Sequence, residues 1–317
     1  MRHLVLIAVL AGTALACHDT VAPGDPSLSS EASDRAHLDL RAERASLIGA
    51  GNALSAAIAA QGVVAGVGGA LTDDAIFLSP RVNLLHGRDA VTSFLSTDAL
   101  APSALSWHVI VADVSNDGTR GFTWGEGSST INFGTGAPRP SFFLIYWRRA
   151  DGGDWQVEAF VFNAGGRQVT PIPAGFGTPD TKHRRNFPNT GPAEQAAQIL
   201  GVDAAFSAAS VSNGSGPAFE QYAAPNAMAV GGPEFVFGPT DIGLAFTGGP
   251  NDVVSWVPLL SGAAASGDLG FSVGEAVFVI EGAGTFYSKY LTIWQKQDTG
   301  AWRFVADEGN NRPAPAP

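Results

Sequence analysis

Two glutamates occupy matching positions in the two halves of this 317-residue chain. Glu126 follows the sequence Gly-Phe-Thr-Trp-Gly, and Glu275 follows Gly-Phe-Ser-Val-Gly. If each stretch is a strand, Glu126 shares a face with Trp124, and Glu275 shares a face with Phe271. A carboxyl group in such apolar surroundings would have a raised pKa and could act as an acid or donate a hydrogen bond to a ligand. The alternative interpretation places this face at a contact between two domains, with each glutamate paired to a nearby Arg or Tyr.

Other residues that could take part in catalysis have simpler structural interpretations. His108 is a candidate acid or base, but it alternates with apolar neighbours as a strand residue would. Asp74 is a candidate base, and a turn or capping residue is the expected alternative. The paired tryptophans of the two halves are expected mostly to pack in cores. The candidate ligand-binding residues are Trp124, Glu126, Tyr146, Phe271 and Glu275.

Several classes of site are not expected. No two histidines stand one, two or three residues apart, and Cys17 is the only cysteine, so we expect no metal. The chain has no phosphate-binding loop, dinucleotide fingerprint or serine nucleophile elbow, so we expect no cofactor. Lys and Arg total 18 against 29 for Asp and Glu, and the net charge of −11 argues against binding to nucleic acid.

The N-terminus has the features of an export signal. Arg2 precedes an apolar run over residues 4–16, which is too short to span a bilayer. The run ends in Ala-Leu-Ala-Cys, which resembles the lipobox of bacterial lipoproteins. We expect residues 1–16 to be a lipoprotein-type signal peptide, Cys17 to carry lipid, and residues 17–31 to be a flexible tether. The expected location is the cell envelope, at the outer membrane or cell surface, and the alternative is a secreted or periplasmic protein.

The candidate residues belong to an internal repeat. Trp107 and Trp147 have counterparts in Trp256 and Trp294, at offsets of 149 and 147 residues. A period of this size indicates the tandem duplication of a whole domain. The expected domains are residues 32–163 and 192–312, with a linker over 164–191 and a tail over 313–317.

Each copy is expected to begin with helices and to end with a series of long strands. In the first copy, Leu40, Leu47 and Leu54 form one apolar stripe of a helix. The expected strands of this copy are residues 106–114, 120–131, 141–149 and 154–161, preceded by a hairpin between residues 75 and 85. Helices first and antiparallel strands last predict an α+β fold, with the helices covering one face of a curved sheet.

The succession of motifs in each copy indicates a family. In the first copy the motifs are Asp-Asp-Ala-Ile, Gly-Arg-Asp-Ala, Trp-X-Val, Gly-Phe-X-X-Gly and a final Trp-X-Val-X-X-X-X-X-Asn. Residues 36–163 and 192–312 thereby resemble the nuclear transport factor 2-like (NTF2-like) superfamily, and in it the SnoaL-like and uncharacterised bacterial relatives of ketosteroid isomerase. The resemblance implies two cone-shaped domains, each with an apolar pocket, that pair with one another. Two copies in one chain could form this pair internally, as a monomeric pseudo-dimer.

The general base of ketosteroid isomerase-like relatives is missing from both copies. The resemblance implies an aspartate after the first strand, where this chain has Ser79 and Gly231. Neither residue can remove a proton from carbon. We therefore expect a module that binds a small apolar molecule or interacts with a partner. The alternative is a cofactor-independent isomerase, cyclase or hydratase that uses a pocket carboxylate.

Overall fold

The computed structural model describes residues 38–316, except for residues 98–99, 101–102, 132–136, 151, 166–170, 175, 177–183, 189 and 232–233. The chain from Leu38 onward forms one compact unit. The expected signal peptide, the tether and Cys17 lie outside the described residues.

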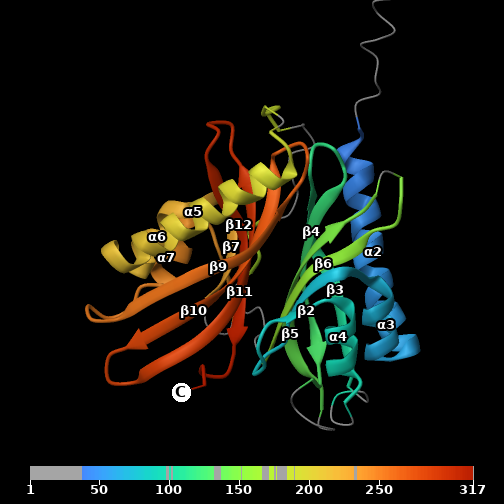
Figure 1. Cartoon of the computed structure of the whole chain (residues 1–317), viewed down its shortest axis with the longest axis horizontal. Helices are drawn as coiled ribbons and strands as arrows, with labels where there is room; N and C mark the ends of the chain where they lie inside the picture. The colour runs from blue at the N-terminus through green and yellow to red at the C-terminus, as the bar shows by residue number, and fades with distance from the viewer. Residues whose placement is uncertain are drawn as a thin grey trace, which may run out of the picture. The chain divides into compact units, whose positions relative to one another are not determined.

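The first half forms one six-stranded sheet with its helices on one face (Figure 1). The strand order is β2-β1-β6-β5-β4-β3, and all neighbours are antiparallel except β1 and β6. In chain order the elements are α2 (Leu40–Gln61), α3 (Val63–Ala70), β1 (Leu71–Leu78), β2 (Leu85–His86), α4 (Arg88–Leu95), β3 (Leu105–Val114), β4 (Arg120–Ser129), β5 (Arg139–Arg148) and β6 (Gln156–Ala164).

The second half repeats this arrangement. Its strand order is β8-β7-β12-β11-β10-β9, and β7 and β12 are the parallel neighbours. In chain order the elements are α5 (Pro192–Asn213), α6 (Ser215–Tyr222), β7 (Ala223–Gly231), β8 (Glu234–Phe237), α7 (Pro239–Ala245), β9 (Val253–Ala263), β10 (Leu269–Ile280), β11 (Gly284–Lys296) and β12 (Trp302–Asn311). The identical order confirms the predicted fold of two tandem α+β copies.

Matching hydrogen bonds fix the long helix of each half to the edge strand of its sheet. Ser55 in α2 accepts the backbone N–H of Trp107 in β3 at 2.9 Å. Ser207 in α5 accepts the backbone N–H of Trp256 in β9 at 2.8 Å. Helix α5 begins at Pro192, where the missing N–H would have had no partner within the helix. These contacts set the distance between helix and sheet, and therefore the space enclosed between them.

The sheet faces without helices pack against each other. The rings of Trp124 and Phe235 lie 4.6 Å apart between centroids, and so do the rings of Tyr146 and Phe271. All four side chains are buried in a core cluster that contains residues from both halves. The two halves therefore form the intramolecular pseudo-dimer that the duplication predicted.

An arginine from the linker joins the two halves. Arg184 Nη1 lies 2.7 Å from Asp113 Oδ2 at the end of β3, and its Nε lies 2.6 Å from Asp268 Oδ2 just before β10. Asp113 also pairs with Arg44 of α2 at 2.8 Å. The side chain of Asp268 is fully buried. Arg184 is thus held by carboxylates of both halves.

Candidate functional site

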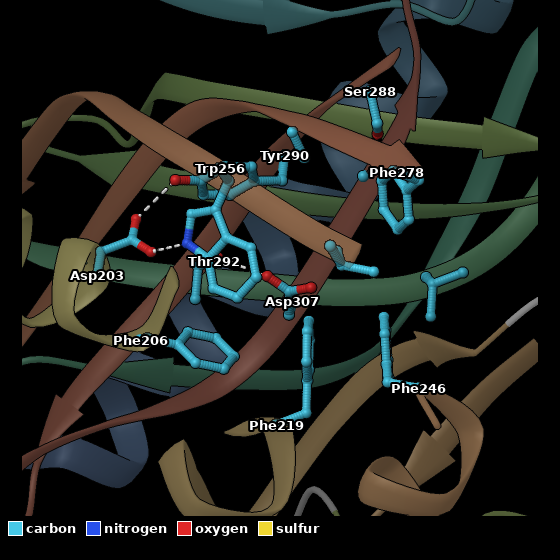
Figure 2. Close-up of a pocket in the computed structure, with 14 residues that line it drawn as sticks. Asp203, Phe206, Phe219, Phe246, Trp256, Phe278, Ser288, Tyr290, Thr292 and Asp307 are labelled. Carbon is cyan, nitrogen blue, oxygen red and sulfur yellow. Dashed lines mark hydrogen bonds between the residues drawn. The ribbon is translucent and has the colours of Figure 1, made fainter. Parts of the chain in front are cut away.

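A cavity in the second half lies between the helices and the sheet face that they cover (Figure 2). Its volume is about 120 Å³. An apolar cavity of roughly this size can hold a benzene-sized molecule. The residues that line the cavity are Asp203, Phe206, Phe219, Val230, Phe246, Val254, Trp256, Ala276, Phe278, Ser288, Tyr290, Thr292, Asp307 and Gly309.

Asp203 in α5 provides the first of two carboxyl groups at this cavity. It is 1% exposed and stands within the buried face of the helix. Its Oδ1 accepts the indole N–H of Trp256 at 2.7 Å, and its Oδ2 accepts the hydroxyl of Tyr290 at 2.8 Å. Burial raises the pKa of Asp203, and hydrogen bonds from Ser272, Trp256 and Tyr290 oppose that rise.

Tyr290 reaches Asp203 because it stands opposite a glycine. Gly274 in β10 pairs with Tyr290 in β11. A Cβ at residue 274 would lie 2.4 Å from the Tyr290 hydroxyl oxygen, closer than any real contact of that kind. Any other residue would therefore displace the phenol group. The Gly-Phe-X-X-Gly motif of the second copy ends in the residue that makes room for this part of the site.

Asp307 in β12 provides the second carboxyl group. It pairs with Thr292 of β11, whose hydroxyl donates to the Asp307 Oδ1. Burial raises the pKa of Asp307 to about 7, the Thr292 hydrogen bond opposes this rise, and the nearby Asp203 carboxylate adds to it. In Figure 2 the Asp307 carboxyl group lies above Phe219 and beside the ring of Trp256. A group that titrates near neutral pH inside an apolar space suits an acid or a base.

Aromatic rings form most of the remaining wall. Phe219 and Phe246 stack with 3.7 Å between ring centroids, and Phe206 packs edge-on against Trp256 at 4.5 Å. None of the described residues that line the cavity is Lys, Arg or His. The site therefore combines two carboxyl groups with aromatic faces and lacks a basic side chain among the residues described.

The first half has no carboxylate at the position of Asp203. Gly51 stands at the same place in the 22-residue helix α2 as Asp203 does in the 22-residue helix α5. The indole N–H of Trp107 donates to the backbone carbonyl of Gly51 at 3.1 Å. The equivalent indole of Trp256 donates to the side chain of Asp203. The indole N–H of the tryptophan thus has an acceptor in both halves. Only in the second half is this acceptor a carboxyl group.

The strands of the first half fill the corresponding space. At an offset of 147 residues, Tyr290, Thr292 and Asp307 correspond to Phe143, Ile145 and Phe160. These three residues are buried. Trp107 packs against Phe143 at 5.0 Å and against Phe160 at 5.6 Å between centroids. The rings of Phe143 and Phe160 thus fill this space in the first half. In the second half the same space is hollow and has polar groups at one end.

The two glutamates singled out from the sequence lie outside this cavity. Ala276 lines it, so the preceding residue Glu275 is directed to the opposite face of β10. Glu275 Oε2 lies 2.9 Å from Arg312 Nη2, which corrects the expectation of a pocket carboxylate and agrees with the alternative of an ion pair. Glu126 Oε1 lies 3.8 Å from His108 Nε2, and both side chains are more than one-third exposed, at 38% and 64%.

The other predicted site residues also lie elsewhere. Trp124, Tyr146 and Phe271 contribute to the contact between the halves. Asp74 in β1 is more than half exposed and pairs with Arg148, with an Oδ1 to Nη2 distance of 2.6 Å. None of the residues selected from the sequence lines the cavity.

Sequence reasoning missed Asp203, Tyr290 and Asp307. The signal that could have found them is a loss of symmetry between the copies, because the first copy has Gly51 and apolar residues at the matching positions. A second signal is an aspartate within the apolar face of a helix, since a carboxylate is costly to bury unless it is hydrogen-bonded or paired. Both signals depend on aligning the two halves residue by residue.

The described ranges contain neither a cluster of metal-binding side chains nor a membrane-spanning helix. In that part of the chain, no three side chains of His, Cys, Asp or Glu are grouped so that they could hold a metal ion. The helices found there do not include one that is both long enough and apolar enough to cross a membrane.

Three solved structures align with parts of this chain. An NTF2-like protein of unknown function from Pseudomonas putida aligns with 37% of this chain and 87% of its own, at 14% identity and a TM-score of 0.31. A ketosteroid isomerase-like protein from Erwinia carotovora atroseptica aligns with 44% of this chain and 99% of its own, at 17% identity and a TM-score of 0.29. An NTF2-like superfamily protein from Salmonella enterica aligns with 39% of this chain and 95% of its own, at 12% identity and a TM-score of 0.32.

No family profile matches the chain, and no curated protein matches it.

Proposed function

We propose that the second half of this chain binds a small, mainly apolar molecule in the cavity between α5, α6 and β9 to β12, and that the first half acts as its scaffold. The observation that carries this proposal is the difference between the halves. Phe143 and Phe160 fill the space in one half, whereas the same space is hollow in the other. Protein interiors are close-packed and cavities are destabilising, so a partly open apolar space of this kind is typical of a binding site.

The lining supplies the two parts of a small-molecule site. The rings of Phe206, Phe219 and Phe278 would contact the apolar surface of the ligand. Asp307 and Thr292 would fix a polar group of the ligand, because their side chains reach the cavity from neighbouring strands. A mostly apolar pocket with a few polar groups gives both affinity and orientation.

Binding of fluorobenzene to the purified protein, followed by fluorine NMR, tests this proposal. Ala276→Leu should abolish saturable binding, because it places three more carbons in the cavity. Val257→Leu is the matched control, since Val257 in β9 is 62% exposed and does not line the cavity. Unchanged binding to the Ala276→Leu variant, or no saturable binding of any benzene-sized probe, neutral or cationic, to the wild type, would refute the proposal.

A second candidate function is proton transfer by Asp307. The observation that favours it is the pKa of about 7, raised by burial. In this case the cavity would support isomerisation, cyclisation or hydration without a cofactor, and Asp307 would take or give the proton. Deuterium exchange at the α-carbon of a small cyclic ketone should be accelerated by the wild type and by Glu275→Gln, but not by Asp307→Asn. Equal exchange rates with the wild type and Asp307→Asn would exclude it.

We also propose that the chain is exported and anchored in the cell envelope by lipid on Cys17. The supporting features are Arg2, the apolar run after it, and the presence of one cysteine at the end of that run. Cys17→Ser should move the protein from the membrane fraction to the soluble fraction, and mass spectrometry should find acyl chains on the wild type only. A cytoplasmic protein that retains Met1 would contradict this proposal.

We further propose that the protein is a monomer, because both members of the paired domains come from one chain. Light scattering of the protein without its lipid should give the mass of one chain. A stable dimer would contradict this assignment.

A further inference from the structure

The cavity carries two acidic side chains and no described basic one. Asp203 receives its hydrogen bonds from Trp256 and Tyr290, which are both neutral donors. Asp307 receives its hydrogen bond from Thr292, which is also neutral. Two carboxylates that share a small space of low dielectric repel each other, and neutral donors do not cancel their charge. A ligand that brings a positive charge would remove this repulsion.

The rings around the two carboxyl groups favour the same kind of ligand. The ring faces of Phe and Trp carry partial negative charge and attract cations, and cages of aromatic rings recognise alkylated ammonium groups. In Figure 2 the Asp307 carboxyl group lies above Phe219 and beside the Trp256 ring, and Phe246 and Phe278 line the cavity farther to the right. The carboxyl groups and the aromatic rings therefore both favour a ligand with a positively charged ammonium group.

We infer that the ligand of the second half is an organic cation, whose alkylated ammonium group lies between the Asp307 carboxylate and the rings of Phe219 and Trp256. This inference rests on the proposed function, because it assigns a ligand class to the same cavity. The alkyl groups of the ammonium contact the rings, and its charge lies beside the carboxylate. An ammonium that retains an N–H bond also donates a hydrogen bond to Asp307.

Other ligand classes fit the lining less well. An anionic ligand, such as a carboxylic acid, would add a third negative charge to a space that holds Asp203 and Asp307. A neutral ligand would leave both carboxyl groups without a counter-charge, and Asp307 would have to keep its proton. The described residues of the first half offer no such site at the matching positions, because Phe143 and Phe160 occupy them.

Three probes of similar size and different charge test the inference. The first is choline, the second is its uncharged isostere in which a tert-butyl group replaces trimethylammonium, and the third is a carboxylate that carries the same tert-butyl group. Calorimetric titration of the purified protein should show that choline binds about tenfold or more tightly than the uncharged isostere, as expected for a desolvated cation–aromatic contact beside a carboxylate. The carboxylate should not bind.

Two variants separate the charge from the shape of the cavity. Asp307→Asn should bring the ratio of the two affinities close to one, because it removes the charge and keeps the side-chain size. Glu275→Gln is the matched control, since it removes a carboxylate that lies outside the cavity, and its ratio should equal that of the wild type. The comparison of probes on the wild type decides the question even if Asp307→Asn does not fold.

The possible results distinguish this inference from the proposed function. If the uncharged isostere binds as tightly as choline or more tightly, the ligand is not a cation and the inference is overturned, while the binding cavity stands. The same conclusion follows if choline does not bind but fluorobenzene does. If neither choline nor fluorobenzene binds, both the inference and the proposed function fail.

Discussion

Replacement of Asp307 by Asn should make the protein more stable. This gain should appear only at pH values at which the carboxyl group of the wild type would be charged. Burial raises the pKa of this group from 3.8 to about 7. Below about pH 4 the group is protonated in the folded and the unfolded chain, so it has no pH-dependent effect on stability. Between about pH 4 and pH 7 the unfolded chain loses the proton while the folded chain keeps it, so the free energy of unfolding falls as the pH rises.

The size of the effect follows from this difference in pKa. Each unit corresponds to about 1.4 kcal/mol, so a rise of about three units lowers the free energy of unfolding by up to about 4 kcal/mol above pH 7. Asparagine has almost the same size as aspartate and can accept the hydrogen bond from Thr292, but it carries no charge. We therefore expect Asp307→Asn to gain up to about 4 kcal/mol at about pH 8 and almost nothing at about pH 4.

Urea unfolding followed by circular dichroism measures this gain. The wild type, Asp307→Asn and Glu275→Gln are compared at both pH values. The difference between wild type and Asp307→Asn includes the interactions of this group with Asp203 and Glu308, because both carboxyl groups interact with the charge of Asp307. A gain of equal size at both pH values, or a loss of stability at the higher one, would show that the carboxyl group is not held in the environment that the structure describes.

Three further predictions concern the contact between the halves, the filled first half and the charge of the ligand. Arg184→Ala should lower the free energy of unfolding by about 3–5 kcal/mol in urea unfolding, because Asp268 stays buried without its partner. Arg185→Ala, which loses one exposed hydrogen bond, should change it by less than about 0.5 kcal/mol. Phe160→Ala should cost about 3–5 kcal/mol and open a second binding site for fluorobenzene in the first half. The affinity for choline, measured by calorimetry, should increase as the pH rises through about 7, because Asp307 must lose its proton, whereas the affinity for the uncharged isostere should not.

Each of these predictions has a result that contradicts it. Equal stabilities of the Arg184→Ala and Arg185→Ala proteins would mean that the linker does not join the halves. A Phe160→Ala protein of wild-type stability would mean that the first half is not closely packed. A choline affinity that is constant between about pH 6 and pH 8 would separate binding from the ionisation of Asp307.

The fold could be predicted from the sequence because its main signals are local and are repeated. The apolar stripe of Leu40, Leu47 and Leu54 predicts a helix, and all three residues are buried in α2. The tryptophans at offsets of 149 and 147 residues indicate the duplication, and the two halves have the same strand order. The parallel pairing of β1 with β6, and of β7 with β12, was not predicted. Pairing between strands that are distant in the chain depends on tertiary packing, which local periodicity does not contain.

The candidate site could not be predicted by the same reasoning. Alternation along β10 separates Glu275 from its neighbours Gly274 and Ala276, but it does not say which face of the sheet encloses a cavity. In this protein the helices cover the face of Ala276, and the face of Glu275 is turned away from the cavity. The importance of Asp203 depends on Trp256 and Tyr290, which are brought to it from two distant strands.

The covalent connection between the halves removes a genetic restriction that a symmetric dimer would face. In a dimer of identical subunits, every substitution occurs twice, so a phenylalanine that fills one pocket fills the other as well. A chain that encodes both members separately can keep Phe160 in one half and Asp307 in the other. One half is then free to accumulate substitutions that only increase stability, and its gain offsets the instability that the two carboxyl groups of the cavity impose on the other. The duplication thus allows stability to be selected in one half of the gene and the chemistry of the cavity in the other half.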